Sequence, residues 1–177
     1  MTHTIQQLSD MEDIRTLKHR YFRAIDTADW DLLDGMFTDD VHVEYIGGTY
    51  HVSLDGAANM TEFLANSFHA QCMAMHHGHM PEITLTGDNS ADGVWYLQDI
   101  FLDFIKKENT WGTAIYRDTY RREQGSWKIQ STVYDRIMEV IEPLNDAARY
   151  TAHRLATTGR KVEELKDISH LIAWEET

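Results

Sequence analysis

The sequence predicts an α+β fold, because helical and strand patterns are segregated along the chain and do not alternate. Two helical patterns come first, followed by a short hairpin, a third helical pattern and a series of long strands. Turn residues join the long strands directly, which is typical of antiparallel hairpins and leaves no place for the crossover helices of a parallel sheet. The length of 177 residues is that of one domain with a sizeable core.

Three helices are expected before residue 69. The first is expected over 10–26, since Ser9 and Glu12 form a capping-box pattern and apolar residues then recur at helical spacing. Asp29 is the expected N-cap of a short second helix, and the third is expected over 57–68, where Met and Phe side chains share one face.

Strands are expected where apolar and polar residues alternate between turn signals. The predicted hairpins pair 41–45 with 49–52, 80–85 with 93–104, and 110–122 with 126–138. A last helix is expected over 145–159. The tail that follows carries apolar residues at helical spacing and could be a lid over a pocket or an arm onto a neighbouring subunit.

Composition excludes several classes of partner. The net charge of −13 and the pI near 5.0 argue against nucleic acid and anionic membranes, which attract basic faces. The N-terminus has no signal-peptide pattern and no apolar run is long enough to span a bilayer, so a cytoplasmic protein is expected. The single cysteine excludes an internal disulfide, and the lack of a glycine-rich phosphate loop gives no indication of a nucleotide cofactor.

The most unusual chemistry lies in two neighbouring strands. Three histidines, at 76, 77 and 79, fall within four residues, and Asp99 interrupts the apolar run that follows the turn. A buried carboxylate needs either a partner or a raised pKa. The hairpin brings Asp99 close to the histidines. One alternative is that the histidines have a structural role only, as hydrogen-bonding side chains. Alternation also places His77 and His79 on one face, where Asp99 could complete a metal site with two histidines and one carboxylate.

Aromatic and apolar residues could line a pocket for a ring-containing or steroid-sized molecule, although they could equally belong to the core. These residues are Trp95, Phe101, Tyr116, Tyr134, Met60 and Phe63.

Over about residues 11–138, the order and spacing of several phrases resemble the SnoaL-like branch of the nuclear-transport-factor-2-like superfamily. The phrases are Tyr21-Phe22-Arg23-Ala24-Ile25-Asp26, Trp30-Asp31-Leu32-Leu33, Phe37-Thr38-Asp39-Asp40, Met75-His76-His77-Gly78, Gly112-Thr113-Ala114-Ile115-Tyr116 and Gly125-Ser126-Trp127-Lys128-Ile129. The resemblance implies a cone-shaped barrel in which a curved, mostly antiparallel sheet wraps around the N-terminal helices. It assigns 1–143 to this domain and 144–177 to a helical extension, and it implies a homo-oligomer, a trimer or else a dimer.

The family includes cofactor-free enzymes such as scytalone dehydratase, bile-acid 7α-dehydratase and the lindane dehydrochlorinase. The resemblance implies that His76 is the general base, that Asp26 orients it and that no metal or cofactor is required. Tyr21 corresponds to an acid or hydrogen-bond donor and Arg136 to a substrate contact. Asp99 would either be protonated and donate, or stay ionised beside a cation such as Arg136.

The expected activity is therefore a dehydratase-like elimination on a small cyclic, aromatic or steroid-sized substrate. A double-bond isomerase, a polyketide-cyclase-like enzyme and a non-catalytic subunit like that of ring-hydroxylating dioxygenases remain alternatives, because fold alone does not decide function.

Overall fold

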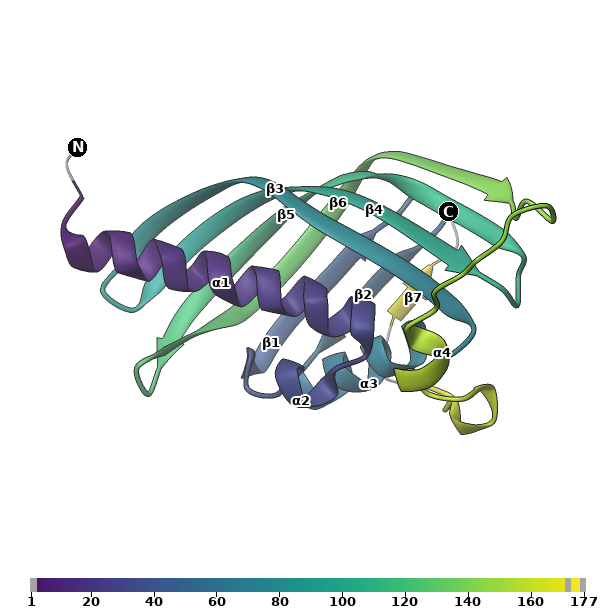
Figure 1. Ribbon diagram of the computed structural model, residues 1–177. Coiled ribbons are helices and arrows are strands. Elements are labelled where there is room, and N and C mark those ends of the chain that lie inside the picture. Colours follow the sequence, from purple (N-terminus) through teal and green to yellow (C-terminus); the bar gives the residue numbers. More distant parts are fainter. Residues whose placement is uncertain (1–2, 171–172, 176–177) are drawn as a thin grey trace.

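The computed structural model describes residues 3–170 and 173–175 of the chain. It has a long first helix, short helices and one large curved sheet (Figure 1). The helices are α1 (Ile5–Thr27), α2 (Trp30–Leu33), α3 (Ala57–Ser67), α4 (Leu155–Thr158) and the 3₁₀ turn η1 (Val162–Glu164). The strands are β1 (Phe37–Ile46), β2 (His51–Asp55), β3 (Cys72–Gly87), β4 (Ser90–Asp103), β5 (Glu108–Glu123), β6 (Ser126–Pro143) and β7 (Ala173–Glu175).

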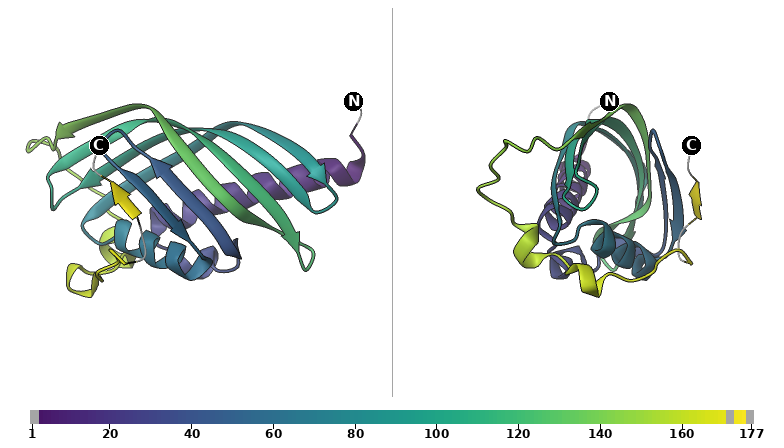
Figure 2. Two further views of the ribbon diagram at one scale, coloured as in Figure 1. Left: turned by 180° about the vertical axis from the view of Figure 1, so that it is seen from behind. Right: turned by 90° about the vertical axis from the view of Figure 1, so that its right-hand side faces the viewer.

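The strand order is β3-β4-β5-β6-β1-β2-β7, and all neighbouring strands are antiparallel except β1 and β6, which are parallel. This confirms the predicted α+β class and the mixed, mostly antiparallel sheet. The sheet bends around α1 and α3 (Figure 2). Among the described residues its two edges, β3 and β7, do not pair with each other, so the expected barrel is an open, strongly curved sheet.

Helix α1 begins five residues earlier than expected. Thr4 and Gln7 form the capping box: the Thr4 hydroxyl accepts the Gln7 N–H, and the Gln7 side chain accepts the Thr4 N–H. The pattern at Ser9 is therefore an interior part of the helix. The buried face of α1 carries the large side chains of Ile14, Tyr21 and Phe22.

Helix α1 packs directly on β3, and Gly78 makes this close approach possible. A Cβ atom at Gly78 would lie 2.5 Å from Cε2 of Phe22 and 3.3 Å from Cε3 of Trp95. Both rings are buried, so neither could move aside easily. The glycine between two histidines therefore sets the distance between the helix and the strand that carries them.

The C-terminal segment differs most from the prediction. The helix expected over 145–159 is limited to the single turn α4, because Leu155 is its only buried side chain and supplies too little apolar contact for a longer helix. Among the described residues after 160, the helical spacing corresponds to η1 and to the strand β7, which pairs with β2.

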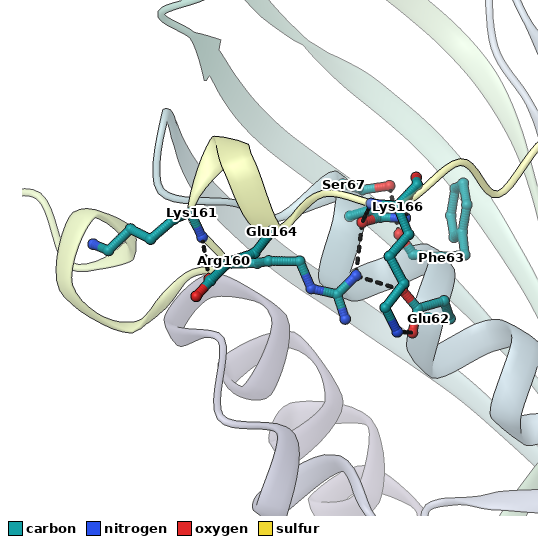
Figure 3. Close-up of polar contacts among 8 residues, drawn as sticks. Glu62, Phe63, Ser67, Arg160, Lys161, Glu164 and Lys166 are labelled. Carbon is teal, nitrogen blue, oxygen red and sulfur yellow. Dashed lines mark hydrogen bonds and ion pairs between the residues drawn. The ribbon is translucent and has the colours of Figure 1, made fainter.

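Residues 160–166 are fastened to α3 of the same chain (Figure 3). Glu62 accepts hydrogen bonds from Arg160 and from Lys166, the latter with Nζ 2.9 Å from Oε2, and the Asn66 side chain accepts one from Arg160 at 2.7 Å.

None of the helices in the described part of the chain is long and apolar enough to cross a membrane.

Candidate active site

A cavity of about 380 Å³ lies between the concave face of the sheet, α1 and α3. We call it the central cavity. Most of the residues expected from the sequence to form a site contribute to its lining. These are Tyr21, Phe63, His76, Asp99, Phe101, Tyr116, Tyr134 and Arg136.

His76 and Asp26 form the centre of this site. Asp26 lies in the last turn of α1 and holds His76 twice: Oδ1 lies 2.6 Å from Nδ1 of the imidazole, and Oδ2 accepts the backbone N–H at 3.0 Å. The His76 side chain is only 9% exposed. The Asp26 carboxylate accepts a hydrogen bond from the Nδ1–H group, so the neutral ring carries its lone pair on Nε2.

Two aromatic rings fix the orientation of this imidazole. Phe22 lies parallel to it, with ring centroids 6.0 Å apart and planes inclined by 5°, and Phe68 contacts it edge-on at 5.4 Å. Asp26 and Phe22 belong to α1 and Phe68 is the C-cap residue of α3, so two other elements hold the ring that β3 carries. Such support leaves the imidazole oriented before a substrate binds.

Tyrosine hydroxyls occupy much of the cavity wall. The Tyr21 and Tyr45 hydroxyl oxygens are 3.0 Å apart, and the Tyr50 and Tyr134 hydroxyls also bond to each other. Burial raises the pKa of Tyr21 and of Tyr45, so both remain phenols that can donate a proton or a hydrogen bond.

Sequence reasoning missed Tyr45 and Tyr50. Tyr45 could have been found, since strand alternation places it on the same buried face as Val41 and Val43. Tyr50 was expected in the strand over 49–52 but lies in the turn between β1 and β2, where strand alternation does not indicate the direction of a side chain.

Asp99 binds Arg136, not a histidine. The two guanidinium Nη atoms each donate to one carboxylate oxygen, with Nη2 2.8 Å from Oδ2. Such a bidentate pair requires the ionised carboxylate, so of the two expected states of Asp99 the geometry favours the ionised one. Arg136 also lies next to Glu139, with Nε 3.0 Å from Oε2.

The alternative metal site is not assembled. Asp99 lies directly opposite His76 in the pairing of β3 with β4, so these two share a face of the sheet. His77 and His79 point to the other face, with their rings 5.7 Å apart. They border an open outer groove of about 510 Å³ between α1 and β3, which Asp26 and His76 also line. Asp99 therefore cannot join them, and within the described residues no group of three such side chains has the geometry to hold a metal ion.

Two predicted lining residues belong to the core instead. Trp95 is on the concave face but lies beneath α1, where its ring contacts His19 at 5.9 Å and its Nε1 donates to the Tyr120 hydroxyl. Met60 is completely buried in the core. Asp26 likewise does not line the central cavity; it lies in the outer groove and reaches the cavity only through His76.

Comparisons with known proteins agree with this architecture. Residues 6–133, most of the chain, match the model of the SnoaL-like domain, so the chain belongs to the SnoaL-like domain family. Several solved structures share its fold at low sequence identity.

The hexachlorocyclohexane dehydrochlorinase LinA-type3 from Novosphingobium barchaimii is 16% identical, with a TM-score of 0.67 over 82% of this chain and 96% of the other. A candidate scytalone dehydratase from Novosphingobium aromaticivorans is 18% identical, with a TM-score of 0.67 over 81% and 96%. A protein of unknown function from Mycobacterium tuberculosis, Rv3472, is 18% identical, with a TM-score of 0.63 over 95% and 94%. These similarities establish the fold.

Proposed function

We propose that the protein is a cofactor-independent lyase that eliminates a leaving group, in a dehydratase-like reaction, from a small cyclic or aromatic molecule. The observation that carries the proposal is that Asp26 binds two of the three nitrogens of His76, the ring Nδ1 and the backbone N. With Nδ1 bound to Asp26, Nε2 is the free nitrogen of a ring that lines the central cavity. Histidine is the side chain that most often serves as a general base in proton transfer.

In the proposed reaction, Nε2 of His76 first removes a proton from a carbon atom of the substrate. The electrons of the broken C–H bond form the new double bond as the C–O bond to the leaving hydroxyl breaks. Asp26 stabilises the imidazolium through the Nδ1 hydrogen bond without taking the proton itself. The leaving oxygen departs as water after receiving a proton from the imidazolium, or from Tyr21, whose phenolate then takes the proton from the imidazolium; either route returns His76 to its neutral form.

Tyr21 and Tyr45 supply the hydrogen-bond donors that this reaction needs. Their hydroxyls are bonded to each other and both are kept protonated by burial, so the pair can donate to a substrate carbonyl or to the leaving oxygen. A carbonyl held in this way would carry the negative charge that develops when the neighbouring carbon loses its proton.

The lining suggests the class of substrate. Five aromatic side chains line the cavity: Phe63, Phe68, Phe101, Tyr116 and Tyr134. Its volume of about 380 Å³ is within the range of small-molecule sites. The named activities of the dehydrochlorinase and of the candidate scytalone dehydratase, both of them eliminations, support the same reaction class for this chain.

The expected homo-oligomer, a trimer or else a dimer, stays a prediction, as does the cytoplasmic location. Side chains such as Trp111 (37% exposed) and Ile137 (57% exposed) on the long strands support an association surface. Sedimentation of the purified protein at micromolar concentration would test this, and a monomer would contradict it.

The proposed activity can be tested with a panel of hydroxylated and halogenated cyclic compounds, incubated with the wild-type protein and with His76→Ala, each with and without a chelator. We expect products that have lost water or hydrogen halide, from the wild type only and regardless of the chelator. A product isomeric with its substrate would indicate the double-bond isomerase instead. Turnover of no compound by the wild type, or turnover abolished by the chelator and restored by a metal, would contradict the proposal.

A further inference from the structure

Arg136 and Glu139 face the same side of β6, although residues three apart on a regular strand face opposite sides. The register explains this: Thr113 pairs with Met138 while Ala114 pairs with Arg136, which leaves Ile137 as an extra, bulged residue. The Ile137 side chain is 57% exposed. Both Arg136 and Glu139 therefore line the central cavity.

Gly112 permits this bulge. It pairs with Glu139, and a Cβ atom added to it would lie 2.1 Å from the carbonyl oxygen of Met138. A glycine is needed where two backbones approach so closely. The position of Glu139 in the cavity is thus built into the fold through a defined irregularity.

Glu139 connects two parts of the cavity wall. Its Oε2 lies 3.0 Å from Nε of Arg136, and its Oε1 accepts the backbone N–H of Gly48 at 3.1 Å. Gly48 belongs to the tight turn that carries Tyr50, whose hydroxyl bonds to that of Tyr134. One carboxylate, whose side chain is only 6% exposed, therefore holds both the guanidinium and the turn.

The charge at this end of the cavity is unfavourable for an anion. The single positive charge of Arg136 faces two carboxylates, those of Asp99 and Glu139. Asp99 accepts hydrogen bonds from two of the five guanidinium N–H groups, and Glu139 is in ion-pair contact with Nε. Elsewhere in the lining, Asp103 and Glu108 outnumber Lys106.

We propose that Glu139 is a positioning residue which holds Arg136 and the Tyr50 turn together as a subsite for an uncharged oxygen atom of the substrate, a carbonyl or a hydroxyl. The subsite supplies donors without a net positive charge, so a carboxylate or phosphate is disfavoured there. This inference rests on the proposed function, since it concerns the substrate of the same cavity, and it adds the class of molecule that the enzyme accepts.

Two probes of the same ring system test the subsite by calorimetric titration at pH 7: 1-naphthol, which is neutral, and 1-naphthoate, which is an anion. We expect the wild type to bind 1-naphthol at least about tenfold more tightly. In Glu139→Gln the amide oxygen still accepts the Gly48 N–H while one negative charge is lost. We therefore expect 1-naphthol affinity within about threefold of the wild type and 1-naphthoate affinity increased about tenfold.

Glu139→Ala removes both links and should weaken 1-naphthol binding about tenfold, which the glutamine variant should rescue. Glu142→Gln is the matched control, because Glu142 lies on the same strand but contacts the exposed Trp111. It should leave both affinities unchanged. Thermal melts would verify that each variant is folded.

The proposal is contradicted if the wild type binds 1-naphthoate as tightly as 1-naphthol or binds neither. Equal changes in both affinities in Glu139→Gln would also contradict it, because a merely structural residue would affect the two probes alike. These titrations need no turnover. A failure here leaves the role of His76 untouched, and an inactive protein that shows the expected binding preference would contradict only the proposed reaction.

Discussion

His76 and His77 are neighbours in the chain but lie in two different environments. His76 faces the central cavity, is almost completely covered and is held by Asp26 and two phenylalanines. His77 is exposed on the outer groove beside His79. Successive residues of a strand point to opposite faces of the sheet. The chemistry available to a histidine in β3 therefore depends on the face that it occupies.

Of the substitutions on the two faces of β3, His76→Ala should have the largest effect on turnover. Removing the base should reduce turnover about 10²-fold or more. Folding should be nearly intact, since the backbone N–H still binds Asp26 and the lost ring lines a cavity. Steady-state kinetics with thermal melts would measure both, with His77→Ala as the control. Near-wild-type turnover would show that another residue is the base.

Gly78→Ala should damage the inward face of β3 through packing alone. The added methyl group would meet Phe22 and Trp95, and overpacking of this kind costs about 1–3 kcal/mol of unfolding free energy. Denaturant unfolding would measure the loss, with the exposed His79→Ala on the same strand as the control. An unchanged midpoint would show that α1 does not pack against this glycine as described.

The inward face should also respond to alkaline pH. Burial raises the pKa of the Cys72 thiol to about 12, whereas the thiol of the unfolded chain ionises near its ordinary value of 9.0. The unfolded state thus loses its proton first, so stability is fully present below pH 9 and falls as the pH rises toward 12. The buried tyrosines, whose pKa values burial also raises, act in the same direction.

Denaturant unfolding at a series of pH values above 8 would measure this fall, and Cys72→Ala should make it shallower between pH 9 and 12. A thiol reagent should label native Cys72 only as the protein unfolds. Rapid labelling of the folded protein would contradict the described burial.

The smallest effect is expected on the outer face. His77→Ala and His79→Ala should each change turnover by no more than a few-fold, since neither side chain lines the central cavity. A loss as large as that of His76→Ala would mean that the reaction uses the outer groove and would revive a metal-dependent alternative.

Much of the fold and the centre of the site could be predicted from the sequence. The alternation and the turns located the long hairpins, and their pairing brings Asp99 close to the histidines, as expected. Which of the histidines lies opposite Asp99 was not predicted. The identity of Asp26 as the partner of His76 came from the family resemblance, since no periodicity links two residues that are 50 positions apart.

The parts that could not be predicted depend on tertiary details. The position of Glu139 in the cavity was not predicted, because the bulge at Ile137 reverses the alternation of side chains beyond it. The sequence signal for the bulge is Gly112 on the neighbouring strand. The helix expected over 145–159 was a wrong prediction for a different reason. Helical spacing was present, but only Leu155 finds a buried position against the rest of the domain.

The most direct test of the central claim compares Asp26→Asn, His76→Ala and the double variant on a confirmed substrate. Asp26→Asn should lower kcat about 10²-fold, because an amide can favour the wrong tautomer and cannot offset the imidazolium charge. If the two side chains act as one unit, the double variant should be scarcely slower than the slower single variant. Losses that multiply in the double variant would show that Asp26 and His76 act independently, and would contradict the account.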